Sequence, residues 1–76
     1  MKTLQMDVLL YHPTRQQEMR IELRVPMDNY AARRLLDAQD NGVTIYEQNA
    51  LYKLASALGE LNGLRGMPLR VREVQG

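Results

Sequence analysis

Residues 2–25 read KTLQMDVLLYHPTRQQEMRIELRV, and this stretch decides the fold. Apolar residues alternate with polar ones in two runs, which are Leu4, Met6, Val8 and Leu10, then Met19, Ile21, Leu23 and Val25. Because successive side chains of a strand point to opposite faces of a sheet, each run buries one row and exposes the other. His12 and Pro13 open a polar turn between the runs. The sequence therefore predicts a β-hairpin with strands over about residues 2–11 and 17–25.

A helix is predicted after Pro26, which closes the second strand. Asp28 or Asn29 can cap it, because a short polar side chain accepts a hydrogen bond from an amide of the first turn. Asn41 and Gly42 are typical of a helix end. The expected buried face contains Ala31, Ala32, Leu35, Leu36, Ala38 and Gln39, and the expected polar face contains Asn29, Arg33, Asp37 and Asp40.

A second helix is predicted up to Asn62 and Gly63. Its start is open between two interpretations: the β-branched and aromatic residues at 43–46 favour a strand, whereas Thr44 and Glu47 form a capping box. We interpret the segment as a helix start. The apolar spacing that follows is helical, with Leu51, Leu54, Ala55, Leu58 and Leu61 on one face. We expect Val8, Leu23, Leu54 and Leu58 to meet in one core.

A last strand is predicted after a connector that contains Gly63, Gly66 and Pro68. In it Leu69 and Val71 are expected to point inward, and Arg70 and Arg72 outward. The fold class is α+β, a β-hairpin followed by two helices and a third strand (ββααβ). The first strand carries the fewest charges, so we expect it in the middle, with strand order 2-1-3. Two antiparallel helices on one face would make the third strand parallel to the first, in a mixed sheet.

Length and composition restrict the class of protein. The 76 residues suffice for one small globular domain, residues 1–76. The chain has no cysteine, which favours a reducing compartment, and we expect a cytoplasmic protein. No apolar run approaches the roughly 20 residues that span a bilayer, so no membrane partner is expected. The short chain has neither Phe nor Trp to fill its core, and therefore we expect a homodimer.

The residue types that carry chemistry are scarce. Nucleophilic catalysis needs a hydroxyl or thiol beside a base, but the single serine, Ser56, is predicted on a solvent-facing side of a helix and the single histidine, His12, in a turn. One histidine without cysteine predicts no metal site. Gly63 and Gly66 lack a phosphate-binding fingerprint, so no cofactor is expected. We predict no catalytic residues and no enzyme, and interpret Asp37 and Asp40 as ordinary surface charge.

One surface is a candidate for binding, the face of the sheet opposite the helices. Its expected residues are Leu9, Tyr11, Arg20, Arg24, Arg70 and Arg72. Arginine is enriched at protein interfaces, and an apolar pair on a charged face indicates a contact patch. A merely solvated face remains the alternative. The favoured function is a small protein-binding accessory module that uses this face or the strand edges. The other function is nucleic-acid binding by the arginines, which the well-mixed net charge of +1 disfavours.

Overall fold

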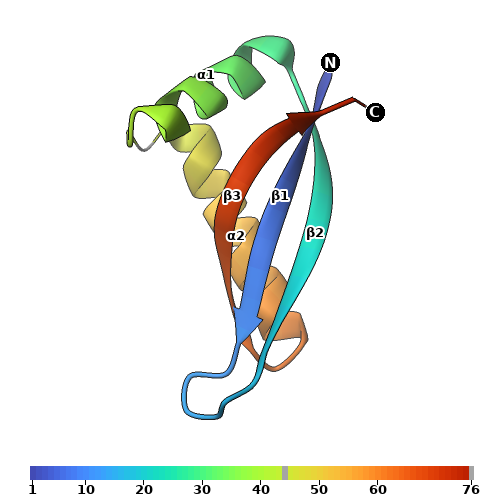
Figure 1. The fold of residues 1–76 in the computed structure, drawn as a ribbon, viewed down its shortest axis with the longest axis vertical. Helices are drawn as coiled ribbons and strands as arrows, with labels where there is room; N and C mark the ends of the chain where they lie inside the picture. The colour runs from blue at the N-terminus through green and yellow to red at the C-terminus, as the bar shows by residue number, and fades with distance from the viewer. Residues whose placement is uncertain (44, 76) are drawn as a thin grey trace.

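The computed structural model describes residues 1–43 and 45–75, with the backbone alone at residues 46 and 47. The elements within this part are β1 (Lys2–Tyr11), β2 (Glu18–Met27), α1 (Asn29–Asp40), α2 (Tyr46–Leu61) and β3 (Arg65–Val74) (Figure 1). The ββααβ order, the α+β class and the strand order β2-β1-β3 are as the sequence predicts. Neither described helix is long and apolar enough to cross a membrane.

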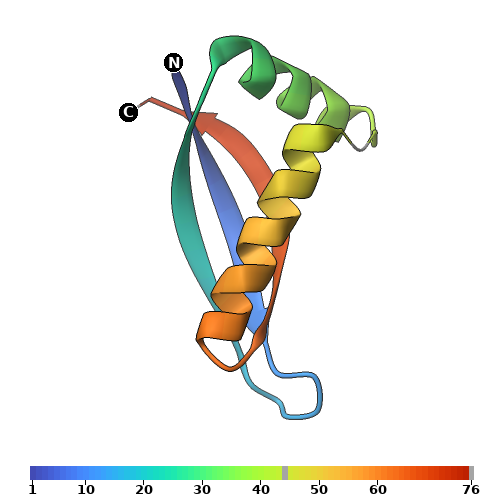
Figure 2. The same cartoon turned by 180° about the vertical axis from the view of Figure 1, so that it is seen from behind.

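The direction of β3 differs from the sequence-based expectation. β3 pairs antiparallel with β1, as β2 does, so the sheet is antiparallel throughout and not mixed. The expectation assumed that both helices run along the sheet and cancel each other's direction. Figures 1 and 2 show instead that α1 lies across one end of the sheet. Only α2 returns along the strands, and β3 therefore runs in the same direction as β2.

Two strands extend further than their prolines and glycine suggest. Pro26 lies inside β2, on an edge strand where a missing N–H breaks no ladder bond. Gly66 and Pro68, expected in a connector, lie inside β3. The pairing of β3 with β1 also shifts by one residue at Leu69, which leaves that side chain 40% exposed and not inward as predicted.

The core lies on the inner face of the sheet, between β1 and the helices. The inner row of β1, Leu4, Met6, Val8 and Leu10, is almost fully buried. It packs with Ala32 and Leu35 of α1, Leu51 and Ala55 of α2, and Val71 of β3. Leu23 and Leu58 pack only at the margin of this core, and Leu54 is 40% exposed. The predicted meeting of Val8, Leu23, Leu54 and Leu58 is therefore wrong at Leu54, because α2 turns Leu51, Ala55 and Gly59 to the sheet.

The helix ends follow the sequence where they can be compared. The Asp28 carboxylate accepts hydrogen bonds from the backbone N–H groups of Tyr30 and Ala31, at 3.0 and 3.2 Å, and so caps α1. Gly42, just after α1, has a φ of +69°. α2 begins at Tyr46 and ends at Leu61, so residues 43–46 lead into a helix as interpreted, but its N-cap is Ile45, one residue later than the capping box predicts, and Ile45 makes no side-chain cap hydrogen bond. Thr44 and the Glu47 side chain, the expected capping box, lie outside the described residues.

The backbones of α2 and β3 approach each other closely at two glycines. A Cβ atom placed on Gly59 would overlap backbone atoms of Arg65 and Gly66. A Cβ atom placed on Gly66 would overlap the carbonyl oxygen of Ala55. Because the obstructing atoms are backbone and not flexible side chains, no rotamer change can make room. These two glycines allow α2 to lie directly on β3.

We predict that Gly66→Ala severely destabilises the domain, because α2 would have to move off β3 and expose core surface. Overpacking of this kind costs about 1–3 kcal/mol or more, a large share of the stability of so small a domain. Gly42→Ala is the matched control. A Cβ atom there meets open space, and only its left-handed backbone is strained, at about 1 kcal/mol. Urea denaturation of both variants tests this, and equal losses would contradict the close approach.

Candidate functional site

The face of the sheet turned away from the helices is called the open face here. It is formed by the residues of β1 from Gln5 to Tyr11 that point away from the core and by their partners on the two neighbouring strands. In rows of β2, β1 and β3, these are Arg24, Gln5, Arg72; Glu22, Asp7, Arg70; Arg20, Leu9, Met67; and Glu18, Tyr11, Arg65. The last two rows, nearest the hairpin loop, carry its apolar surface.

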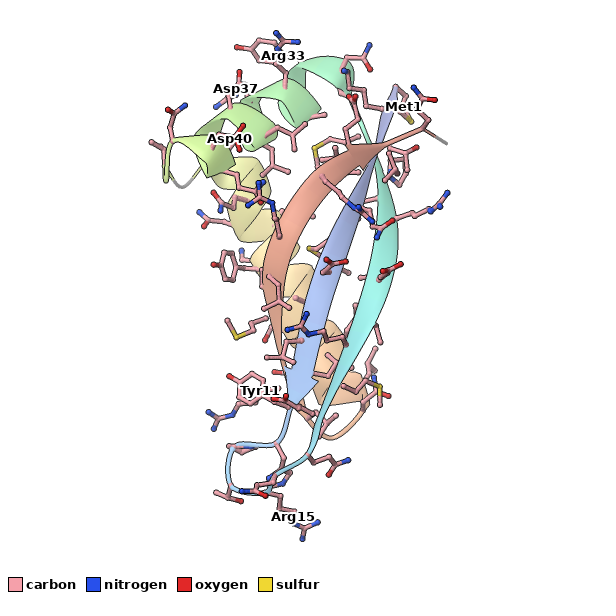
Figure 3. The ribbon with its side chains drawn as sticks, in the orientation of Figure 1. Met1, Tyr11, Arg15, Arg33, Asp37 and Asp40 are labelled. Carbon is pink, nitrogen blue, oxygen red and sulfur yellow. The ribbon has the colours of Figure 1, made fainter. Side chains whose placement is uncertain are left out.

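A cleft of about 570 Å³ opens where the hairpin loop meets the open face. Leu9, Tyr11 and Met67 supply its apolar lining. The rest of the lining is polar and comes from the loop and the start of β2: His12, Arg15, Gln16, Gln17 and Glu18. Figure 3 shows Tyr11 at the end of β1 and Arg15 on the loop beyond it. An apolar floor with a polar wall suits a side chain that anchors a peptide.

The loop wall is held in shape by the histidine. Nδ1 of His12 accepts hydrogen bonds from the backbone N–H groups of Thr14 and Arg15, at 3.1 and 3.0 Å. The backbone N–H of His12 in turn donates to the Gln17 carbonyl at 3.0 Å. These hydrogen bonds to Nδ1 organise the turn, and His12 lies in the turn as the sequence predicts.

The arginines of the open face lack counter-ions within the described part of the chain. Arg20, Arg24, Arg65, Arg70 and Arg72 are all exposed, and none of them takes part in a salt bridge there. The salt bridge that the described residues do form joins Lys2 to Glu73. Glu73 lies beside the inward-facing Leu4, and so not on the open face. Charge pairing across the strands, which a merely solvated face would favour, is therefore not formed by these arginines.

Two polar groups on the central strand are buried without a partner. Gln5, between Arg24 and Arg72, is 6% exposed, and its Nε2 donates to no described group. Oδ1 of Asp7, between Glu22 and Arg70, is also buried without a hydrogen bond. Such groups destabilise a fold by about 1–3 kcal/mol each. They lie in the middle of the open face, where sequence reasoning had identified no residue of interest.

The structure places the six predicted interface residues on the open face but does not gather them into one spot. Leu9 and Tyr11 line the cleft, and Arg20 is the partner of Leu9 on β2. Arg70 lies one row further along the sheet, and Arg24 and Arg72 lie two rows away. Met67 was missed because Gly66 and Pro68 on either side of it are typical of a connector. The alternation of Arg65, Met67 and the later arginines is also broken by the bulge at Leu69.

The remaining candidates from the sequence lie elsewhere. Ser56 is exposed on α2, on the helix side of the sheet. Asp37 and Asp40 are exposed on α1, at the end of the molecule opposite Tyr11 (Figure 3). Comparisons with protein families, with curated proteins and with solved structures find no significant match to this chain.

We predict that Gln5→Met stabilises the protein by about 1 kcal/mol, because it removes a buried donor without a partner and keeps a side chain of similar length. For a domain of this size that corresponds to a rise in Tm of about 4–8 °C. Gln75→Met, at an exposed position, is the matched control and should change stability by less than about 0.5 kcal/mol. A loss of stability in Gln5→Met would show that the amide is hydrogen-bonded in solution.

Proposed function

We propose that this chain is a non-enzymatic protein-binding module, and that its open face binds an acidic segment of a partner protein. The observation that carries the proposal is the set of open-face arginines that have no counter-ion among the described residues, on the same face as a cleft with an apolar floor. Arginine pairs bidentately with carboxylates through its planar guanidinium group. Leu9, Tyr11 and Met67 would hold an apolar anchor residue of the partner, while Arg70 and Arg72 would pair with its acidic residues.

The charges between the arginines favour a protein over a nucleic acid. Asp7, Glu18 and Glu22 share the open face with the arginines, and they would repel a continuous phosphate backbone. Tyr11 is the aromatic residue on this face, whereas single-stranded nucleic acids are bound by several stacking platforms. A peptide with spaced carboxylates can place each of them beside an arginine and avoid the acidic positions.

The proposal assigns no chemistry to the chain. Nδ1 of His12 is occupied by two backbone N–H groups, and Ser56 lies across the sheet from the cleft. A nucleophile and base therefore do not meet at the cleft. We place the module in the cytoplasm, because a chain without cysteine cannot form the disulfides that stabilise small proteins in oxidising compartments.

Selection from a displayed library of random peptides tests the proposal. We expect the selected peptides to share one bulky apolar residue and several carboxylates. Arg70→Glu combined with Arg72→Glu should weaken their binding by roughly a hundred-fold, since two charge-assisted contacts are reversed at about 1.5 kcal/mol each. Met67→Glu should also weaken peptide binding, because it places a charge in the apolar lining of the cleft.

Arg33→Glu is the matched control, because Arg33 is exposed on α1, away from the open face (Figure 3). It should leave peptide binding unchanged. Labelled DNA and RNA oligonucleotides are tested in parallel over a range of salt concentrations. Tight oligonucleotide binding that falls steeply with salt would replace the proposal with nucleic-acid recognition. Peptides that bind the Arg70→Glu, Arg72→Glu variant as well as the parent would place the site elsewhere.

A further inference from the structure

The two edges of the sheet are not equivalent. The outer edge of β3 is closed at its middle by α1: the Gln39 side chain donates to the Val71 carbonyl at 2.8 Å and accepts from the Val71 N–H at 2.9 Å. Among the described helices and strands, β2 has substantial contacts only with β1. Figure 2 shows α2 lying across β3 and β1, with most of β2 outside its width. The edge of β3 is thus interrupted at Val71, whereas that of β2 is open to pairing.

The backbone groups at this edge can be assigned from the hairpin. The hydrogen bond from His12 to Gln17 makes these two residues a bonded pair, and bonded and non-bonded pairs alternate along an antiparallel ladder. Residues 18, 20, 22 and 24 of β2 thus turn their N–H and C=O groups away from β1, toward the open edge. Pro26 falls in the same series and has no N–H to offer, so the pairing edge ends before it.

We propose that β2 pairs antiparallel with β2 of a second copy of this chain, with Ile21 opposite Ile21. In this register Arg20 lies opposite Glu22, and Glu18 lies opposite Arg24, each in both directions. All of these residues belong to the series that faces the edge, so every such pair can exchange two main-chain hydrogen bonds. Opposite charges on directly facing residues stabilise a sheet, and the sequence of β2 is self-complementary in this sense.

Other registers lose this match. A register with Arg20 opposite Arg20, or with Glu22 opposite Glu22, sets like charges opposite each other. A register with Met19 opposite Met19 would require residues of the hairpin loop to pair in the ladder. A register with Leu23 opposite Leu23 sets Pro26 opposite Arg20. Registers that differ by an odd number of residues would turn apolar side chains to the open face. The Ile21 register is thus the one that satisfies both the charges and the backbone along residues 18–24.

The inner face provides the apolar part of the same interface. The inner row of β2 is partly uncovered: Met19 is 50% exposed, and Ile21, Leu23 and Val25 are half-buried. In the proposed register Met19 lies opposite Leu23 of the second copy, and the two rows continue one another. A two-fold axis perpendicular to the sheet keeps the helices of both copies on one face.

α2 supplies a wall beside this row. The side of α2 that carries Tyr52 lies toward β3, because Tyr52 lines a small pocket together with Pro68 and Leu69. The flank with Leu54 and Leu58 is on the other side of the helix, toward β2. Leu54 is 40% exposed and Leu58 half-buried, so a second copy would cover apolar surface that the monomer leaves open.

Charge reversal tests the register. Analytical ultracentrifugation of the parent chain should show a dimer. Glu22→Arg sets arginine opposite Arg20 at two symmetry-related places, and it should weaken the dimer by roughly ten-fold. Adding Arg20→Glu restores opposite charges in this register and should restore the dimer. Glu60→Arg, on an exposed position of α2, is the matched control and should leave the dimer unchanged.

Cysteine cross-linking tests the same register independently, because the chain has no cysteine of its own. Facing residues of a non-bonded antiparallel pair have Cα atoms about 4.5 Å apart, within the range that a disulfide spans. Ile21→Cys should therefore form a covalent dimer on oxidation. Met19→Cys and Leu23→Cys should cross-link with each other when mixed, and poorly with themselves.

A monomer at high micromolar concentration would overturn the proposal, and so would a dimer that Glu22→Arg leaves intact and Ile21→Cys does not cross-link. The latter result would place the interface on another surface. The proposed function is tested separately, because Arg70 and Arg72 lie on β3 and away from the paired edge. Loss of peptide binding with an intact dimer, or the reverse, distinguishes a failure of one proposal from a failure of the other.

Discussion

The rest of the structure depends on the close approach of two backbones, α2 at Ala55 and Gly59 and β3 at Gly66. Larger side chains at these positions would hold the helix at a greater distance from β3. With glycine and alanine, α2 settles directly on β3 and reaches β1 only in part. The cover over the sheet is therefore asymmetric, because the helix that lies close to one edge leaves the other edge bare.

This asymmetry explains why the two strands of one hairpin are buried so differently. The inner row of β1 is almost completely buried, whereas the inner row of β2, with the same alternation of apolar residues, is only partly buried. α1 increases the difference, because its Ala32 and Leu35 pack with the inner row of β1. An edge strand with an apolar row and free backbone groups is a site for another strand. The fold thus concentrates its unpaired surface on β2.

The two proposals share Glu18, which also lines the cleft, and otherwise use different parts of the open face. Self-pairing of β2 would engage the charges of residues 18–24, and partner binding would engage Arg70, Arg72 and the cleft at Leu9 and Tyr11. In a dimer with a two-fold axis, the open face would be continuous over both copies, with a cleft near each hairpin loop. A partner with two acidic segments would then bind both clefts, and the second binding event would gain from the first.

The sequence by itself determined the elements and much of their order. Alternation identified the hairpin, Asp28 and Gly42 marked the ends of α1, and the low charge of β1 indicated its central place; these signals are local, and each was confirmed. The sequence also named Leu9 and Tyr11, which line the cleft. The direction of β3, the exposure of Leu54, the role of Gly59 and the membership of Met67 in the cleft were decided by tertiary structure. Each depends on where α2 and β3 meet in space, and contacts between residues distant in the chain leave no periodic signal in the sequence of either element.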